Sequence, residues 1–372
     1  RSTLFPYTTL FRSTNRYYLT ELAAKCTAKR MYPDYISEKK MSEIYSGNCF
    51  SPMGCRSFLP AWKDENGNYK FEGRLNIGVQ TLNLPQIAIL ANKDKNLFYN
   101  ILEERLKLIR EMGMLRYNLL KNQPSDVSPI HWQYGGIARL GQGEKIGKLF
   151  LDGYATISVG YIGLHEAVYA MLSESITTKE GHEFALDILN FMKSRADRWK
   201  EETRLAFTLY GTPSESTAGR LCEIDIQTFG DIEGVTDKGY YTNSYHVTPS
   251  EDIDAFSKLK LESQFQTIST GGCISYIEIP NMTNNIEAIE TVIDFMYNNI
   301  TYAEFNTKSD YCQVCGYDGE IMINEDLVWE CPQCHNKDMQ KMNVVRRTCG
   351  YLGENFWSKG RTKDIKDRVM HL

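Results

Sequence analysis

The segment Gly73–Pro85, which reads GRLNIGVQTLNLP, carries the two signals that decide the fold class. Leu75–Thr81 is a β-rich run, and Pro85 suits the first position of a helix, where its missing N–H costs nothing. The segment therefore predicts a strand that leads directly into a helix. The same order of strand and helix recurs along the chain, as is typical of parallel βαβ units.

The predicted elements alternate from about Tyr17 onward and indicate an α/β fold. The helix candidates are Pro85–Asn122 (broken or bent), Leu164–Ser175, His182–Arg204, Ser250–Ser263 and Asn285–Asn299. The strand candidates are Leu75–Thr81, Ala155–Val159, Leu205–Tyr210, Cys273–Ile279 and Tyr302–Asn306. Functional residues are expected in loops at the carboxyl ends of such strands. Periodicity alone leaves open whether the units close into a barrel.

Composition limits the class of protein. A chain of 372 residues with 42% apolar residues can bury a large core. Its net charge of −5 argues against a general polyanion-binding surface, so no direct nucleic-acid partner is expected. No apolar run approaches the roughly 18 residues of a spanning helix, so we expect no membrane partner and a cytoplasmic location. Ten cysteines in a chain of this length fit a reducing compartment.

Four cysteines have the spacing of a metal site. Cys312 and Cys315 form one CxxC pair, and Cys331 and Cys334 form a second pair after 15 intervening residues. Two such knuckles supply four thiolates to tetrahedral zinc, and a site with all four positions filled is structural. Iron in a rubredoxin-like arrangement is the alternative. After Asn306 the chain is punctuated by Cys, Gly and Asp, which indicates a small appended module at 307–345.

Two further segments are ordinary when taken alone. Residues 47–59, reading GNCFSPMGCRSFL, form a Cys-bearing loop with Pro and Gly at its turn. Arg346–Gly353, reading RRTCGYLG, places a Gly in a polar turn, where it lets the backbone approach a partner closely. A buried thiol and a simple turn would explain each segment separately.

Four motifs follow one another along the chain, namely the 47–59 loop, Gly73–Pro85, the two CxxC pairs and Arg346–Gly353. Together and in this order along the chain, they resemble anaerobic (class III) ribonucleoside-triphosphate reductases of the glycyl radical enzyme superfamily, specifically their C-terminal half. The resemblance runs from about Thr14 to Leu372. It implies that 14–306 form part of a ten-stranded α/β barrel, the second half-barrel with a finger loop at 47–59. A zinc ribbon at 307–345 and a glycyl radical loop and tail at 346–372 would follow. Residues 1–13, RSTLFPYTTLFRS, look like a translated sequencing adapter and are expected to be a non-native leader.

The resemblance also implies an oxygen-sensitive reaction and its catalytic residues. Gly350 would hold the radical, because a Gly Cα flattens after losing hydrogen and shares the unpaired electron with the flanking amides. Cys55 would become the thiyl radical that removes the ribose 3′-hydrogen, with Cys49 as the alternative position. Asn76 would hold the ribose or formate by hydrogen bonds. It would not act as a general base, because an amide does not accept a proton near neutral pH. Formate is the expected reductant, and a thioredoxin-type reductant remains open.

A hydroxyl-rich loop after a strand candidate is the expected triphosphate site, since backbone N–H groups at a helix start bind phosphate. Its residues are Thr212, Ser214, Glu215, Ser216 and Thr217. The family further implies a radical-SAM activase, which uses S-adenosylmethionine and an iron–sulfur cluster to install the radical. A homodimer and nucleotide effector sites are expected of the full-length protein, through a missing N-terminal part. The fragment alone is expected to be inactive.

Two alternatives remain. Another glycyl radical enzyme, of the formate acetyltransferase or dehydratase type, would share the Gly and Cys loops but lack the four-Cys module. A non-catalytic zinc-ribbon binding protein on an α/β body would leave the loops of Cys55 and Gly350 unexplained.

Overall fold

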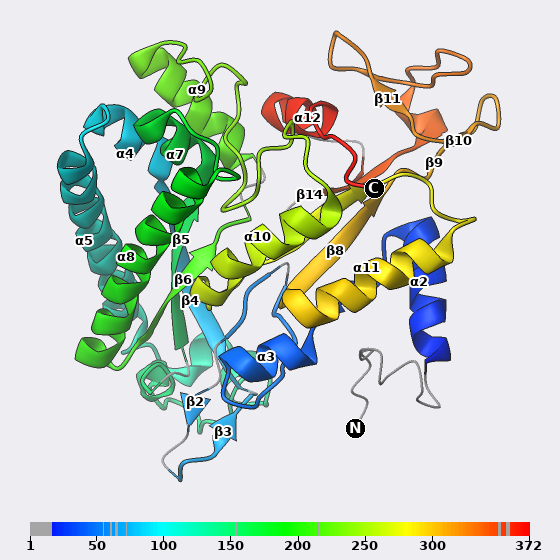
Figure 1. The fold of residues 1–372 in the computed structure, drawn as a ribbon. Helices are drawn as coiled ribbons and strands as arrows, with labels where there is room; N and C mark the ends of the chain where they lie inside the picture. The colour runs from blue at the N-terminus through cyan, green and yellow to red at the C-terminus, as the bar shows by residue number, and fades with distance from the viewer. Residues whose placement is uncertain are drawn as a thin grey trace. The chain divides into compact units, whose positions relative to one another are not determined.

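The structure, a computed structural model, describes residues 17–54, 56–59, 62–63, 66–71, 73–152, 155–213, 216–348, 351–354 and 358–372. The chain divides into two compact units (Figure 1). The first unit comprises Arg1–Cys49, Pro213–Gln266 and Ile274–Leu372, and the second comprises Phe50–Thr212 and Thr267–Cys273. Within the described ranges, no helix has the length and apolar character needed to cross a membrane.

The second unit is built on a parallel sheet. Its strands, in spatial order, are β4 (Leu75–Asn83), β5 (Ala155–Ile162) and β6 (Ala206–Gly211), and both neighbouring pairs are parallel. Helices α5 (Lys95–Leu120) and α8 (Lys179–Thr203) pack against one face of this sheet (Figure 1). The smaller elements are α4 (Leu84–Ala91), η1 (Ser125–Val127), α6 (Pro129–Trp132), η2 (Ile146–Leu149), α7 (Leu164–Leu172) and the hairpin β2 (Trp62–Lys63) with β3 (Tyr69–Lys70).

The predicted long helix after β4 is broken, as expected. Asn83 caps α4 by accepting the N–H of Gln86, and Asn92 ends it in the left-handed region with a φ of 46°. Asp94 then starts α5 by accepting two backbone N–H groups. Side chains that cap helix starts in this way satisfy orphan donors, so the break is encoded locally.

The first unit contains a second sheet, of order β1-β8-β7. Strands β7 (Ser275–Ile279) and β8 (Tyr302–Thr307) are parallel and are joined by α11 (Ile286–Asn299), whereas β1 (Tyr35–Ile36) runs antiparallel to β8. An apolar core lies between this sheet and α2, α10 and α11. The remaining helices of this unit are α2 (Tyr18–Arg30), α3 (Glu38–Ile44), α9 (Thr217–Phe229), α10 (Ala255–Ile268) and α12 (Lys359–Lys366).

Short strands occupy the chain after β8. Strands β9 (Asp310–Cys312), β10 (Asp318–Gly319) and β13 (Met342–Asn343) form one small sheet, and β11 (Met322–Ile323) pairs with β12 (Trp329–Glu330). The turn η3 (Met339–Lys341) precedes β13. A hairpin of β14 (Val345–Thr348) and β15 (Tyr351–Glu354) follows.

The predicted strands and helices are confirmed, with shifted ends. The helix predicted at Ser250–Ser263 begins instead at Ala255, because Asp254 accepts the N–H groups of Phe256 and Ser257. Helices α2, α3, α9 and α12 were not predicted from the sequence. The parallel strand pairs among the described residues lie in two three-stranded sheets, β4-β5-β6 and β1-β8-β7. The predicted division of the chain into four segments stays a prediction.

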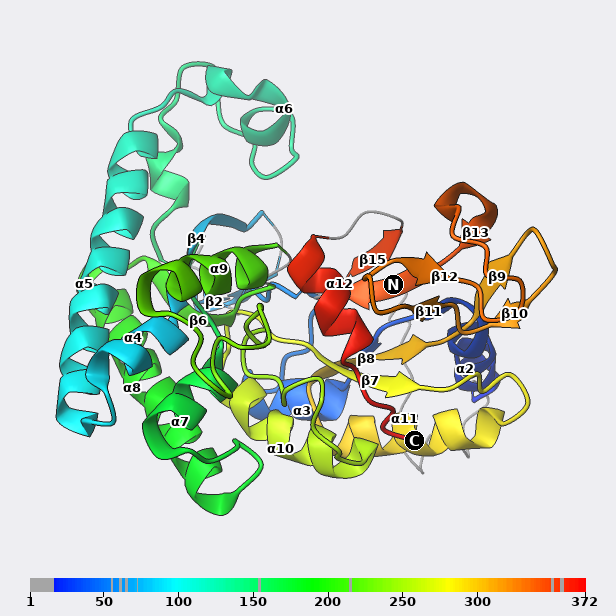
Figure 2. The ribbon, with the colours of Figure 1, turned by 90° about the horizontal axis from the view of Figure 1, so that it is seen from above.

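Helix α12 lies beside α9 (Figure 2). Gly360 of α12 meets Gly219 of α9 at this contact. A Cβ on Gly360 would lie 3.0 Å from the Cα of Gly219 and 3.2 Å from the carbonyl oxygen of Gly239. Both atoms belong to the backbone and cannot rotate away.

Gly360→Ala should therefore lower the free energy of unfolding by about 1–3 kcal/mol through overpacking. Urea denaturation measures this change. Gly219→Ala is the matched control, because its Cβ would lie at an ordinary 3.4 Å from the Cα of Gly360. Equal stability of Gly360→Ala and the wild type would show that the two helices do not meet at this contact.

Candidate functional site

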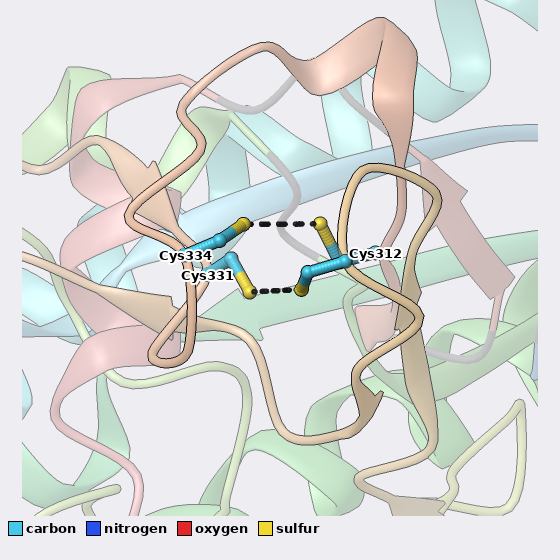
Figure 3. Close-up of side chains that lie close together, drawn as sticks. Cys312, Cys331 and Cys334 are labelled. Atoms are coloured by element: carbon cyan, nitrogen blue, oxygen red, sulfur yellow. Dashed lines mark hydrogen bonds between the residues drawn. The ribbon is translucent and has the colours of Figure 1, made fainter.

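The four cysteines of the CxxC pairs gather in space. Their sulfur atoms lie within 4.8 Å of one another, with 3.7 Å between Cys312 and Cys334 and between Cys315 and Cys331 (Figure 3). Four thiolates around zinc, with Zn–S bonds of about 2.3 Å, would place sulfurs about 3.8 Å apart. The geometry of this cluster therefore fits a tetrahedral metal ion.

Both CxxC pairs close with the same backbone turn. The N–H of Gly316 donates to the carbonyl of Cys312, and the N–H of His335 donates to the carbonyl of Cys331, each at 2.9 Å. Gly316 and His335 both have positive φ, 77° and 57°. The local chain thus turns each pair of thiols toward a common point without help from distant residues.

The pKa values of two thiols in the cluster shift in opposite directions. Burial raises the pKa of the Cys312 thiol. The backbone N–H groups of Cys315 and Val314 and the neighbouring thiols lower it by a larger amount, so the pKa falls to about 7. The backbone N–H of Asn336 lowers the pKa of Cys334, yet burial and the other three thiols raise it to about 12. A cluster of this kind prefers a cation, because a metal ion replaces the thiol protons with one shared positive charge.

The Cys cluster is tied to β14 by a buried ion pair. Asp310, two residues before Cys312, accepts both terminal nitrogens of Arg346 at 2.6 and 2.7 Å. The same carboxylate accepts the N–H of Ile321 at 2.8 Å, and the guanidinium lies 5.1 Å from the ring centre of Trp329. Arg346 and Asp310 are both about 1% exposed. A two-point ion pair of this geometry fixes the strand as well as the charge.

The next residue of β14 is anchored in the other sheet of the same unit. Arg347 pairs with Glu304 of β8 at 2.8 Å and with Asp34 at 2.5 Å, and it also donates to the carbonyl of Met31. Burial lowers the pKa of this guanidinium, but the carboxylates of Glu304 and Asp34 outweigh burial, so the pKa stays above its usual value. Arg347 is therefore charged at any physiological pH.

The hairpin itself is tight. Thr348 at the end of β14 pairs with Tyr351 at the start of β15. Only Cys349 and Gly350 stand between these two residues in the chain. Gly350, the predicted radical site, lies outside the described residues.

The face of the β4–β5–β6 sheet opposite α5 carries polar side chains. Ile157 and Phe207 approach Gly113 of α5, so the alternating residues point away from that helix. The polar residues of this second face are Asn76, Thr81, Thr156, Ser158, Thr208 and Tyr210. Thr156 is fully buried, and its hydroxyl has no hydrogen-bond partner among the described residues. A polar face on a parallel sheet departs from the continuous apolar pattern of a structural core.

Asn76 lies on that face, at a bulge of β4. Its side-chain nitrogen donates to the hydroxyl of Ser158 at 2.7 Å, and its oxygen accepts the N–H of Gly78 at 2.8 Å. These bonds orient the amide and give it a structural role at the bulge. Its predicted role at a substrate stays a prediction.

Arg56 and Phe58 of the 47–59 loop are anchored within the second unit. Arg56 is fully buried and donates to the carbonyl of Gly211 at 3.2 Å, while the N–H of Phe58 donates to the carbonyl of Gly271 at 2.9 Å. Cys55, the predicted thiyl residue, lies outside the described residues. Cys49 is described, as an exposed residue.

The predicted phosphate loop is described in part. The Thr212 hydroxyl lies 3.1 Å from that of Thr81 in the second unit. In the first unit, α9 begins at Thr217, and its N-cap Ser216 makes no side-chain capping bond. Ser214 and Glu215 lie outside the described residues.

Three buried polar residues of β7 and β8, namely Glu278, Glu304 and Asn306, were not predicted from the sequence. A signal existed for two of them, since Glu278 and Glu304 each interrupt an apolar strand-like run. Glu278 and Asn306 are paired residues of neighbouring strands, and both are about 1% exposed or less. Charged residues are rarely buried without partners, so these positions pointed to an ionic cluster.

Comparison with known proteins agrees with this geometry. The sequence model of the family described as Anaerobic ribonucleoside-triphosphate reductase matches residues 4–371. The anaerobic ribonucleoside-triphosphate reductase of Escherichia coli (strain K12) is 39% identical over 362 residues, which cover 96% of this chain and 51% of the relative. The chain thus spans about half the length of the curated relatives that it matches.

Solved structures share the fold. An anaerobic ribonucleotide reductase superposes with a TM-score of 0.67 at 20% identity, covering 94% of this chain and 52% of that protein. Hydroxyproline dehydratase from Clostridioides difficile superposes with a TM-score of 0.58 at 10% identity, covering 95% and 51%. The fold is therefore common to different reactions, whereas the family match favours the reductases over both alternative interpretations. The resemblance seen in the four motifs is confirmed: the chain belongs to the anaerobic ribonucleoside-triphosphate reductase family.

Proposed function

We propose that this chain stores a radical at Gly350 and takes part in the reduction of ribonucleoside triphosphates to 2′-deoxyribonucleoside triphosphates. The observation that carries the proposal is the β14–β15 hairpin, in which Cys349 and Gly350 stand between two paired strands. Arg346 ties this hairpin to the Cys cluster, and Arg347 ties it to the β7–β8 sheet. A residue that repeatedly exchanges a hydrogen atom with one partner must be held in a fixed position, and the two anchored arginines hold the strand that leads to Gly350.

The chemistry requires two residues to exchange a hydrogen atom. No acid or base near neutral pH can remove the ribose 3′-hydrogen, so a radical must do so. The Gly Cα–H and Cys S–H bonds have similar strengths, and a hydrogen atom can pass from the Cys55 thiol to the Gly350 radical and back. Direct transfer needs the two atoms on the order of 3–3.5 Å apart.

The reaction then balances with formate as reductant. The Cys55 thiyl takes the 3′-hydrogen, and the 2′-hydroxyl leaves as water with one added proton. Formate gives up its hydrogen and two electrons and becomes carbon dioxide, and C2′ gains one hydrogen in place of the hydroxyl. The hydrogen atom held by Cys55 then returns to C3′. In sum, a ribonucleoside triphosphate, formate and one proton yield the deoxyribonucleoside triphosphate, carbon dioxide and water.

Each unit by itself offers polar groups to a substrate. The polar face of β4–β5–β6 offers Asn76 and the hydroxyl of Thr156 to a ribose or to formate. The start of α9, with Ser216 and Thr217, offers backbone N–H groups to phosphate. Thr212, Ser214 and Glu215 complete the proposed triphosphate loop.

The proposal extends to the architecture and partners of the whole protein. The two sheets would belong to a ten-stranded barrel, with 47–59 as its finger loop; their parallel pairs support this arrangement. The metal at the four cysteines would be zinc, which holds the module together and supplies no chemistry to substrate. A radical-SAM activase would install the radical, and the whole protein would form a homodimer that responds to nucleotide effectors.

Removal of the metal should impair the hairpin rather than the substrate contacts. Cys315→Ser should lower zinc from about one ion per chain to a small fraction of that, because a closed site needs all four thiolates. Metal analysis and the yield of glycyl radical after activation measure the two effects. Cys26→Ser, at an exposed Cys of α2, is the matched control. A full radical yield in zinc-free protein would contradict the proposed role of the module.

Cys55→Ser in the whole protein should keep the glycyl radical and lose all formation of deoxyribonucleotide, because a serine O–H bond is too strong to give its hydrogen atom to Gly350. Electron paramagnetic resonance and product analysis after anaerobic activation measure the two properties. Cys49→Ser is the matched control and should retain turnover. Turnover by Cys55→Ser, with none by Cys49→Ser, would transfer the thiyl role to Cys49.

A further inference from the structure

Glu278 contacts one residue that precedes the β14–β15 hairpin in the chain, Asn306, and one that follows it, Arg368. It is the penultimate residue of β7, and only 1% of its surface is exposed. Its Oε1 accepts Nδ2 of Asn306 at 2.5 Å and Nη1 of Arg368 at 2.9 Å. Its Oε2 has no hydrogen-bond partner in the described parts of the chain, so one oxygen atom carries both contacts.

Both partners of Glu278 hold one residue of β14. The side-chain oxygen of Asn306 accepts the N–H of Arg347 at 3.1 Å, and Nη1 of Arg368 donates to the carbonyl of Arg347 at 2.9 Å. Glu278 thereby orients the donor and the acceptor that hold the two backbone groups of Arg347. That residue stands three positions before Gly350 in the sequence.

The backbone of Glu278 holds the end of the chain. Its N–H donates to Nδ1 of His371 at 2.7 Å, and its carbonyl accepts the N–H of His371 at 2.9 Å. Burial and, next, the charge of Lys258 lower the pKa of His371 to about 3. The ring is therefore neutral at physiological pH, as its role as an acceptor requires.

The carboxylate of Glu278 is needed for charge as well as shape. Arg368 is 9% exposed, and its other carboxylate contact, to Asp364, is longer at 3.3 Å. A buried guanidinium that loses its nearer anion must move toward water or toward another acceptor. Either movement would release the carbonyl of Arg347.

We propose that Glu278 is a positioning residue for the glycyl hairpin: it ties Arg347 and His371 to the ends of β7 and β8. It touches no reacting atom and acts through Asn306 and Arg368. The inference rests on the proposed function of Gly350, and it adds to that function the residue that holds the hairpin's base in place.

The test compares Glu278→Gln with Glu287→Gln in the whole protein. Glutamine keeps the shape and one acceptor of Glu278 but removes its charge, and Glu287 is an exposed residue of α11 that controls for the substitution itself. Asn306→Ala is the second variant. It leaves the pair of Glu278 and Arg368 intact and removes only the link to the N–H of Arg347.

Glu278→Gln should speed hydrogen exchange about tenfold in peptides that cover 343–348 and 366–372, because local opening becomes easier. Asn306→Ala should speed exchange in 343–348 only, and Glu287→Gln in neither. After activation, Glu278→Gln should show a lower kcat, on the order of 10–100-fold, with KM nearly unchanged, since misplacement of the reacting group affects the chemical step.

The experiment separates failure of the positioning role of Glu278 from failure of the proposed function of Gly350. Wild-type exchange in both peptides of Glu278→Gln, or a wild-type kcat despite faster exchange, would overturn the positioning role. Absence of a glycyl radical signal from the activated wild type would overturn the proposed function of Gly350, while the exchange data would still decide whether Glu278 holds the hairpin.

Discussion

Two adjacent buried arginines are the constraint on which the candidate site depends. Arg346 and Arg347 follow each other on β14, so their side chains leave opposite sides of the strand. One meets Asp310 of the Cys module, and the other meets Glu304 of β8. Loss of one partner of a buried ion pair costs about 3–5 kcal/mol, because the remaining charge stays buried. The hairpin therefore cannot shift without disturbing either the module or the sheet.

The metal cluster gives one of these anchors its stiffness. The strands of the Cys module are only two or three residues long, and its core is a small cluster that includes Trp329 and Met342. Elements of this size rarely hold a fixed shape without a metal or a disulfide. A zinc ion at the four thiols would supply that rigidity. The ion pair of Asp310 with Arg346 would then hold β14 against the rigid module. A structural metal can thus influence chemistry at a residue that it never touches.

Much of the fold was predictable because its signals are local. The β-rich run of Leu75–Thr81 and the Pro of the following helix identified a βα unit, and the two CxxC pairs identified the metal cluster from spacing alone. Helix α12 was missed because its sequence, KGRTKDIK, has no apolar period; it is held by the glycine contact with α9 and by Arg361 and Asp364.

The ionic cluster was missed for a different reason. Glu278 and Arg368 are separated by 90 residues, and only the fold brings them together. Cys55 and Gly350 lie outside the described residues, so their roles rest on the motifs and on the family.

The central claim is that Gly350 stores the radical, and electron paramagnetic resonance of the activated whole protein tests it most directly. A radical at a glycine Cα is coupled to the one hydrogen that remains there, so the account predicts a doublet. Protein grown with α-deuterated glycine should give a collapsed signal, and Gly350→Ala should give none. A doublet that survives in Gly350→Ala, or no doublet in fully activated wild-type protein, would contradict the account.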